Sequence, residues 1–239
     1  SCTAPGRYCR AIPTIERRTS PGPRRAALES ALRQVRLPSV NQELICLASA
    51  SPRRAILLRQ IGLDCERRPV DVDETPRAGE APADFVRRVA LAKATTAWRE
   101  GVSGRLVLGA DTAVIADDRI FGKPRDDEHA RAMLRRLSGD THEVMTAVAA
   151  VLDGERDCLL STSRVTFRDL GDDEITRYVA TGEPADKAGA YAIQGLAALF
   201  VERLEGSYSG VMGLPLCETG TLLRRFGVDA LADRSEAAA

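Results

Sequence analysis

The chain has 239 residues, a formal net charge of zero and 44% apolar residues, which is enough for one large domain or two small ones. The zero net charge supplies no field that would draw the chain to nucleic acid or to an anionic membrane, and no apolar run approaches the roughly 20 residues of a membrane span. Six scattered cysteines without a CxxC pair, and only two histidines, argue against a disulfide framework, a zinc site or a histidine-based triad and indicate a reducing, cytoplasmic setting.

The two ends of the chain differ in composition from the centre. Residues 1–42 are rich in arginine and proline and poor in acids, which predicts a disordered extension, although organelle transit peptides share this composition. Residues 230–239 are expected to fray. The folded domain is therefore predicted at 43–229.

Within that domain, short apolar runs alternate with amphipathic segments of helical period, which predicts an α/β fold. Helices are expected at 52–61, 82–100, 126–137, 172–181 and 217–226. Strands are expected at 44–48, 67–72, 106–108, 113–116, 144–152, 159–167 and 199–204. Asp117-Asp118 and Asp153-Gly154 indicate two hairpin turns.

The first candidate site is Ser49-Ala-Ser-Pro-Arg-Arg54, where the strand 44–48 turns directly into the helix 52–61. A helix N-terminus exposes unpaired amides and binds anions. Ser51 stands at the N-cap position, and Arg53 and Arg54 carry forked cations suited to phosphate. The stretch suits a phosphate site, although on the local pattern alone a plain capped helix with two solvated arginines is the better explanation.

Acidic residues form the second candidate site. Asp111, in Gly109-Ala-Asp-Thr112, is expected at the end of the strand 106–108, on the edge of the sheet where α/β ligand sites open. The strand 67–72 could bring Asp73 or Glu74 to the same edge. Two carboxylates from separate strands suit Mg²⁺ or Mn²⁺. The alternatives are a turn aspartate and a solvated acidic loop.

Lysine is rare in this chain: all but three of the 34 basic residues are arginine. Lys93, Lys123 and Lys187 are therefore candidates for positions that require a compact ammonium, unless they persist by chance. Lys187 lies in the small, polar stretch 186–195, which has the character of a binding loop. Gln194 of that loop can offer both a donor and an acceptor to a nucleotide base.

Eight short motifs, in order over residues 44–228, resemble the Maf-type nucleotide pyrophosphatases. The matching stretches are Ser49–Arg54, Asp73-Glu74, Gly109–Thr112, Lys123-Pro124, Ser138-Gly139 with His142, Gly182-Glu-Pro184, Asp186–Gly195 and Gly213-Leu-Pro-Leu216. The resemblance implies a mixed α/β fold with an elongated sheet, flanking helices and two lobes around a central cleft, similar to the inosine triphosphate pyrophosphatase fold. It also implies cleavage of a nucleoside triphosphate between the α- and β-phosphates with a divalent cation.

The resemblance also implies roles for individual residues. It makes Asp111 the proton acceptor that activates water. It assigns base selectivity to Arg53, Thr112 and Gln194. It assigns phosphate binding to Ser51, Arg54, Lys93 and Lys123. It assigns the divalent cation, Mg²⁺ or Mn²⁺, to Glu74 and Asp111.

The stretch 186–195 resembles the branch of the family that acts on dTTP and UTP, because it carries Lys187 and Gln194 where the 7-methyl-GTP branch differs. Ala192 and Gly210 depart from the usual pattern of the dTTP and UTP branch. The alternatives are 7-methyl-GTP or another house-cleaning nucleotide as substrate, and a non-catalytic nucleotide-binding regulator of cell division. The resemblance implies a nucleoside triphosphate as the partner, a possible homodimer, and neither nucleic acid nor membrane.

Overall fold

The computed structural model describes residues 45–102 and 104–232. All of them belong to the second of two compact units of the chain, residues 38–239. The extension predicted at 1–42 lies outside the described residues, as does the end of the predicted tail, 233–239.

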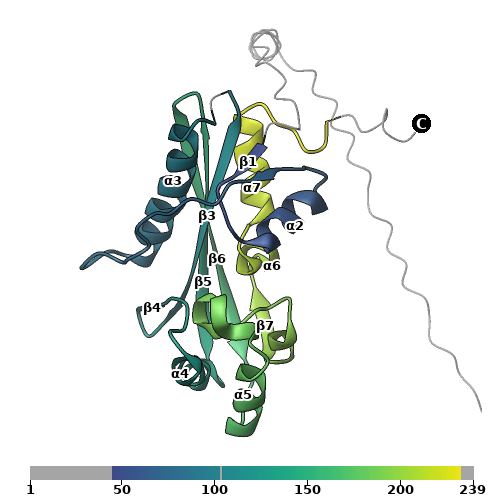
Figure 1. Ribbon diagram of the computed structural model, residues 1–239. Coiled ribbons are helices and arrows are strands. Elements are labelled where there is room, and N and C mark those ends of the chain that lie inside the picture. Colours follow the sequence, from purple (N-terminus) through teal and green to yellow (C-terminus); the bar gives the residue numbers. More distant parts are fainter. Residues whose placement is uncertain (1–44, 103, 233–239) are drawn as a thin grey trace, which may run out of the picture. The chain divides into compact units, whose positions relative to one another are not determined.

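One mixed sheet of seven strands runs through the described part of the chain (Figure 1). Its strands are β1 Ile45–Leu47, β2 Glu66–Arg67, β3 Leu106–Ala116, β4 Arg119–Phe121, β5 Thr141–Leu152, β6 Glu155–Phe167 and β7 Val201–Glu205. The order is β2-β1-β3-β5-β6-β7, and β4 pairs with β3. β1 is parallel to β2 and to β3, whereas the other pairs are antiparallel. The predicted α/β class is confirmed as a mixed sheet with flanking helices.

Helices cover both faces of the sheet. On one face lies α3 (Pro82–Arg99), and on the other lie α2 (Pro52–Gln60) and α7 (Leu216–Arg225). The remaining helices are α4 (Asp127–Leu137), α5 (Asp172–Val179), α6 (Tyr208–Met212) and the 3-10 turns η2 (Glu183–Asp186), η3 (Ala188–Ala190) and η4 (Leu196–Leu199). In Figure 1, α4 and α5 lie at the lower end of the long strands, away from α3 and α7.

β1 shows why apolar runs in this chain form buried strands. Successive side chains point to opposite faces of a sheet. Ile45 and Leu47 enter the core beneath α2 and α7, and Cys46 enters the core beneath α3. Because both faces are covered, every residue of the strand is buried and the sequence reads as a continuous apolar run.

The expected strands 106–108 and 113–116 are one continuous strand, β3, so the prediction that Gly109-Ala-Asp-Thr112 ends a strand was wrong. β5 pairs with β3 from Val107 to Ile115 without interruption. The polar pair Asp111-Thr112 is therefore held within the sheet by a full ladder on that side. Local turn preference predicts a turn at these residues, but pairing with β5 determines their backbone conformation and makes them part of the strand.

The other edge of β3 explains how a mid-strand aspartate still reaches a cleft. β1 pairs with β3 only as far as Leu108, and β4 pairs with it only from Val114. Both lie on the edge opposite β5, so residues 109–113 have no strand beside them there within the described residues. We call this stretch the edge gap. Asp111 therefore lies at an open edge of the sheet, as expected. The edge is open because the neighbouring strand β1 ends there, and not because β3 ends.

Other elements differ from prediction mainly in length. The strand expected at 67–72 is reduced to the two residues of β2, and the chain beyond it is a loop up to α3. Both predicted hairpins are confirmed, with positive φ angles of 50° and 57° at Asp117 and Asp118 and of 49° and 90° at Asp153 and Gly154. The strands β5 and β6, which flank the second of these hairpins, extend further than the predicted 144–152 and 159–167.

Candidate active site

The alternation of side chains along β3 directs two neighbouring residues to different helices. Asp111 points to the α3 side of the sheet, and Thr112 points to the side of α2 and α6. Gly109 lets α3 approach closely: a Cβ there would lie 2.7 Å from Ala94 N and nearer still to Ala90 O. This close approach brings α3 within hydrogen-bonding reach of Asp111.

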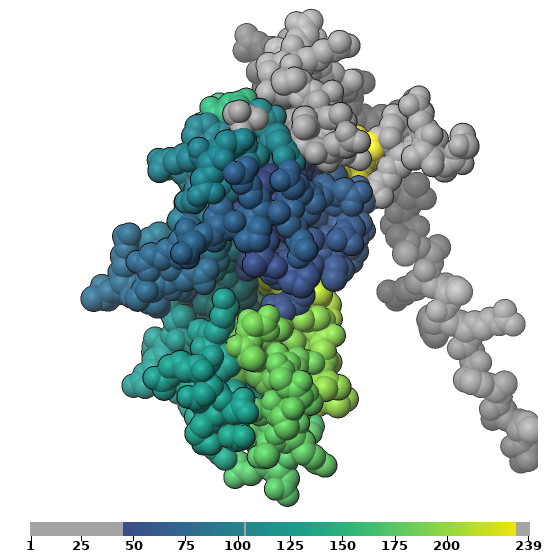
Figure 2. All heavy atoms as spheres, in the orientation of Figure 1, coloured from purple at the N-terminus to yellow at the C-terminus, as the bar shows by residue number. Residues whose placement is uncertain are grey.

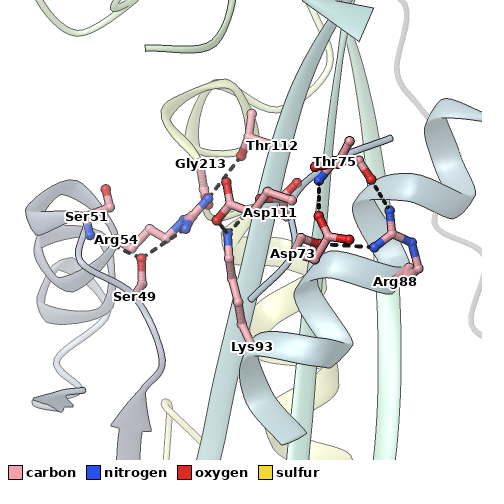
Figure 3. Close-up of polar contacts among 11 residues, drawn as sticks. Ser49, Ser51, Arg54, Asp73, Thr75, Arg88, Lys93, Asp111, Thr112 and Gly213 are labelled. Carbon is pink, nitrogen blue, oxygen red and sulfur yellow. Dashed lines mark hydrogen bonds and ion pairs between the residues drawn. The ribbon is translucent and has the colours of Figure 1, made fainter. Parts of the chain in front are cut away.

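Lys93 is the residue of α3 that faces Asp111. It belongs to the buried face of that helix and is only 7% exposed, so its ammonium is largely shielded from bulk water. Its Nζ lies 2.8 Å from Asp111 Oδ1 (Figure 3). The same Nζ lies 2.7 Å from Glu74 Oε1. One buried cation thus joins two carboxylates that are distant in sequence, which is the pairing that a buried charge requires.

The loop between β2 and α3 delivers Glu74 to this cation. Arg88 of α3 donates to the carbonyls of Asp73 (3.3 Å) and Thr75 (3.0 Å), the residues on either side of Glu74. The same guanidinium pairs with Glu80 through Nε at 2.6 Å and Nη2 at 2.8 Å. Asp73 instead accepts from the Thr75 amide at 2.9 Å, so of the two predicted acids it is Glu74 that reaches the site.

The two carboxylates differ in basicity. Burial raises the pKa of Asp111, although the charges of Lys93 and Arg54 act against that change. Burial also acts to raise the pKa of Glu74, but the hydrogen bond and charge of Lys93 outweigh it and hold that pKa below its ordinary value. Asp111 is therefore the stronger base, and Glu74 is the more firmly ionised of the pair.

Arg54 forms the opposite wall of the edge gap and is fixed at every nitrogen. Its Nε donates to Gly213 O at 2.7 Å, Nη1 to Ser49 Oγ at 3.0 Å, and Nη2 to Thr112 Oγ1 at 3.4 Å (Figure 3). Thr146 of β5 completes the network, because its Oγ1 lies 3.0 Å from Thr112 Oγ1. The guanidinium is thus held in place before any ligand arrives.

Ser51 occupies the N-cap position of α2, as predicted, but its side chain makes no capping hydrogen bond. Its buried Oγ has no hydrogen-bond partner among the described residues. An unpartnered buried hydroxyl is costly unless a ligand or water completes it. With the free amides at the start of α2, this hydroxyl makes the turn a place where an oxyanion fits.

A single cleft of about 630 Å³ joins these groups. All nine predicted site residues line it: Ser51, Arg53, Arg54, Glu74, Lys93, Asp111, Thr112, Lys123 and Gln194. Arg53 is half-buried within electrostatic reach of Asp186, whereas Lys123 and Gln194 are exposed. In the space-filling view (Figure 2) blue atoms of the first described segments border green atoms of later segments in the middle of the view. The third rare lysine, Lys187, also lines the cleft but is paired with its neighbour Asp186.

Sequence reasoning missed two residues that shape this cleft. Arg88 gives no signal among so many arginines, because its role depends on the loop that folds back over α3. Thr146 gives a weak signal, since it is a polar residue, only 1% exposed, inside the apolar strand β5.

A divalent cation is compatible with the residues present. No group of three or more histidine, cysteine, aspartate or glutamate side chains is arranged for a metal ion within the described ranges. Glu74 and Asp111 nevertheless converge on one position, where the Lys93 ammonium now lies. Two carboxylates that leave the remaining ligand positions to phosphate and water are a usual set for Mg²⁺.

A mixed sheet with an anion site and two converging carboxylates in one cleft defines an enzyme fold suited to phosphate esters or anhydrides. The chain belongs to the Maf family: the family model described as "Maf-like protein" matches residues 44–226. The predicted family is thereby confirmed.

Two relatives illustrate the similarity. A dTTP/UTP pyrophosphatase of Methylococcus capsulatus is 57% identical over 187 residues, which cover 77% of this chain and 91% of that protein. A dTTP/UTP pyrophosphatase of Anaeromyxobacter dehalogenans is 55% identical over 188 residues, covering 77% and 94%. Among solved structures, the Ham1 protein of Staphylococcus aureus is 18% identical with a TM-score of 0.40, covering 65% of this chain and 90% of that one. No helix among the described residues is long and apolar enough to cross a membrane.

Proposed function

We propose that this protein hydrolyses dTTP and UTP to the nucleoside monophosphate and pyrophosphate. The observation that carries the proposal is the buried Lys93 ammonium between Glu74 and Asp111, in one cleft with Arg54 and the start of α2. Membership of the Maf family supports the reaction class. The relatives are about half identical to this chain over most of their length. Their name, dTTP/UTP pyrophosphatase, supports the two substrates.

We assign binding of the triphosphate to two sets of hydrogen-bond donors, one on each wall of the cleft. Arg54, the Ser51 hydroxyl and the amides of the first turn of α2 that follow Pro52 provide a preformed set of donors on one wall of the cleft. Lys123 and Lys93 provide ammonium groups on the other. Donors that are fixed in advance contribute most where charge develops during the reaction, since they need no reorganisation at that moment.

Asp111 is the residue we assign to water activation. Its raised pKa makes it a better proton acceptor than an ordinary carboxylate. The oxygen of water attacks the α-phosphorus in line, the bond from that phosphorus to the bridging oxygen breaks, and the proton passes to Asp111. The pyrophosphate leaves as an anion among Lys93, Lys123 and Arg54, and positioning with electrostatic stabilisation supplies most of the rate, as in other phosphoryl transfers.

Glu74 and Asp111 are the residues that would hold a divalent cation, Mg²⁺ or Mn²⁺. When bound, such an ion neutralises charge on the phosphate oxygens. Lys93 lies between the same two carboxylates, and its charge acts to lower the pKa of each. Selectivity for the base is assigned to Arg53, Thr112 and Gln194, and a homodimer and a cytoplasmic location remain predictions.

The test is release of pyrophosphate by the full chain, measured as phosphate after adding inorganic pyrophosphatase, with Mg²⁺ and with dTTP, UTP, dCTP or 7-methyl-GTP. The proposal expects the first two to be the best substrates and the products to be monophosphate and pyrophosphate. Preference for 7-methyl-GTP would move the chain to the other branch. Binding of nucleotides without turnover of any of them would refute an enzymatic role and favour a regulator.

A further inference from the structure

Gln194 lies in a segment that neither a long helix nor a strand supports. It is exposed, and it stands between the 3-10 turns η3 and η4. A flexible glutamine on such a segment has no preferred direction toward a base, so selectivity requires something that fixes its backbone. The residues that follow Gln194 show what does so.

The carboxylate of Glu183 accepts hydrogen bonds from the backbone that follows Gln194. Leu196 N donates to Oε2 at 3.0 Å, and Ala197 N donates to Oε1 at 3.3 Å. Tyr178 of α5 donates from its hydroxyl to the same Oε1 at 2.9 Å, which holds the carboxylate from the other side. One half-buried side chain therefore ties the Gln194 segment to α5.

Gly195 shows how closely the two segments approach. A Cβ at this position would lie less than 3.0 Å from both carboxylate oxygens of Glu183. The φ angle of −111° does not itself demand glycine, so the requirement arises from the contact with Glu183. Gln194 is therefore followed by a glycine whose backbone packs directly against the Glu183 carboxylate.

We infer that Glu183 is a positioning residue for base selectivity, acting through the backbone of Gln194. This inference rests on the proposed function, because it takes Gln194 as a group that reads the base. It assigns a task to Glu183 in the Gly182-Glu-Pro184 motif, which the proposed chemistry does not use. The side-chain amide of Gln194 offers one donor and one acceptor, and thymine and cytosine differ in donor and acceptor at the edge such an amide reads.

The variant Glu183→Gln tests this directly. An amide of the same shape must turn its NH₂ toward one of the two backbone N–H groups, whichever way it is oriented. We expect kcat/KM for dTTP relative to dCTP to fall by roughly 10- to 100-fold, as for a misplaced binding group, mainly through KM for dTTP. Glu183→Asp, which keeps the charge, should restore part of the ratio. Glu202→Gln, an exposed glutamate on β7, is the matched control and should leave the ratio unchanged.

A double-mutant cycle with Gly195→Ala separates positioning from a general loss of stability. The alanine Cβ should lower the dTTP to dCTP ratio when Glu183 is present, and much less in the Glu183→Ala background, where the space is free. A wild-type chain that hydrolyses dTTP, with the same ratio in Glu183→Gln, would overturn this inference and leave the proposed function intact. A wild type that hydrolyses no nucleotide would overturn the proposed function itself.

Discussion

Replacing Asp111 with asparagine separates the chemistry of the site from its stability. The change keeps the shape of the side chain and removes the proton acceptor that lies 2.8 Å from Lys93 Nζ. Loss of a general base costs on the order of 10²- to 10⁴-fold in rate. Lys93 keeps Glu74 at 2.7 Å, so the buried ammonium is not left without a counter-ion. We expect kcat for dTTP to fall by that factor and binding of dTTP to persist.

The same variant should not be less stable at neutral pH. Burial places the folded-state pKa of Asp111 above its ordinary value of 3.8. Between those two pKa values the folded state binds more protons than the unfolded state, so ionisation of Asp111 lowers stability as the pH rises. Asparagine removes that penalty, and the variant should gain stability relative to wild type across this window and keep the gain above it.

The assay is pyrophosphate release with dTTP and Mg²⁺, together with thermal melts of both proteins from pH 3.5 to 8. Asp71→Asn is the matched control, since Asp71 is exposed in the acidic stretch beside Glu74. Turnover of Asp111→Asn within a few-fold of wild type would refute the role of Asp111 as proton acceptor. A melting temperature that drops at pH 7 would refute the argument from burial.

Three further changes probe the close helix contact, the loop clamp and the buried histidine. Gly109→Ala should destabilise the fold by about 3 kcal/mol, because the added methyl meets the backbone of α3 at Ala90; chemical denaturation measures this. Arg88→Ala frees the carbonyls on both sides of Glu74 and should raise the Mg²⁺ concentration for half-maximal activity by roughly 10- to 100-fold, read by metal titration. His142 has its pKa lowered from 6.5 to about 4 by burial, so the unfolded state takes up a proton first as the pH falls between those values. His142→Gln should therefore remove about 3 kcal/mol of the stability lost from pH 6.5 to 4 in urea titrations.

Each of these changes has a matched control in the chain. Gly171→Ala places a methyl where nothing lies within 4 Å, and equal destabilisation would contradict the contact argument for the glycine of β3. Arg87→Ala removes the exposed neighbour of the clamping arginine, and an equal shift in the metal titration would contradict the clamp. His129→Gln changes the other histidine, which is less buried, and an equal flattening of the pH profile would contradict the role of burial.

Much of the fold could be predicted because local signals and tertiary packing agree. Pro52 at the start of α2 and the buried stripe of α3 fix two helices from sequence alone. The strand β3 could not be predicted as one element, because polar Asp111-Thr112 interrupts its apolar pattern and only pairing with β5 makes it continuous. The strand β2 is shorter than predicted because its apolar pattern continues beyond its pairing. The apolar residues after Arg67 pack against the core beneath α3, but among the described residues no strand pairs with them.

The candidate site was predictable where chemistry selects residue types and unpredictable where geometry selects contacts. The rarity of lysine in this chain indicated Lys93 and Lys123 as candidate site residues. The order of the family motifs indicated Asp111 as the proton acceptor. The clamp on Glu74 and the support of Gln194 depend on hydrogen bonds to backbone carbonyls and amides, which any residue type can supply. Such partners leave no trace in composition, so only the folded structure reveals Arg88 and shows which groups Glu183 of the Gly182-Glu-Pro184 motif contacts.

The edge gap of β3 also has a consequence for self-association. An unpaired sheet edge is a template on which a foreign strand can add and start aggregation. Within the described part of the chain, the stretch of this edge of β3 without a neighbouring strand covers residues 109–113, and β1 and β4 pair with β3 at either end of it. An incoming strand would have to displace one of these neighbours before it could form a ladder, whereas a small molecule needs no such displacement. The interruption at which we propose that a nucleotide binds is therefore too short to nucleate a fibril.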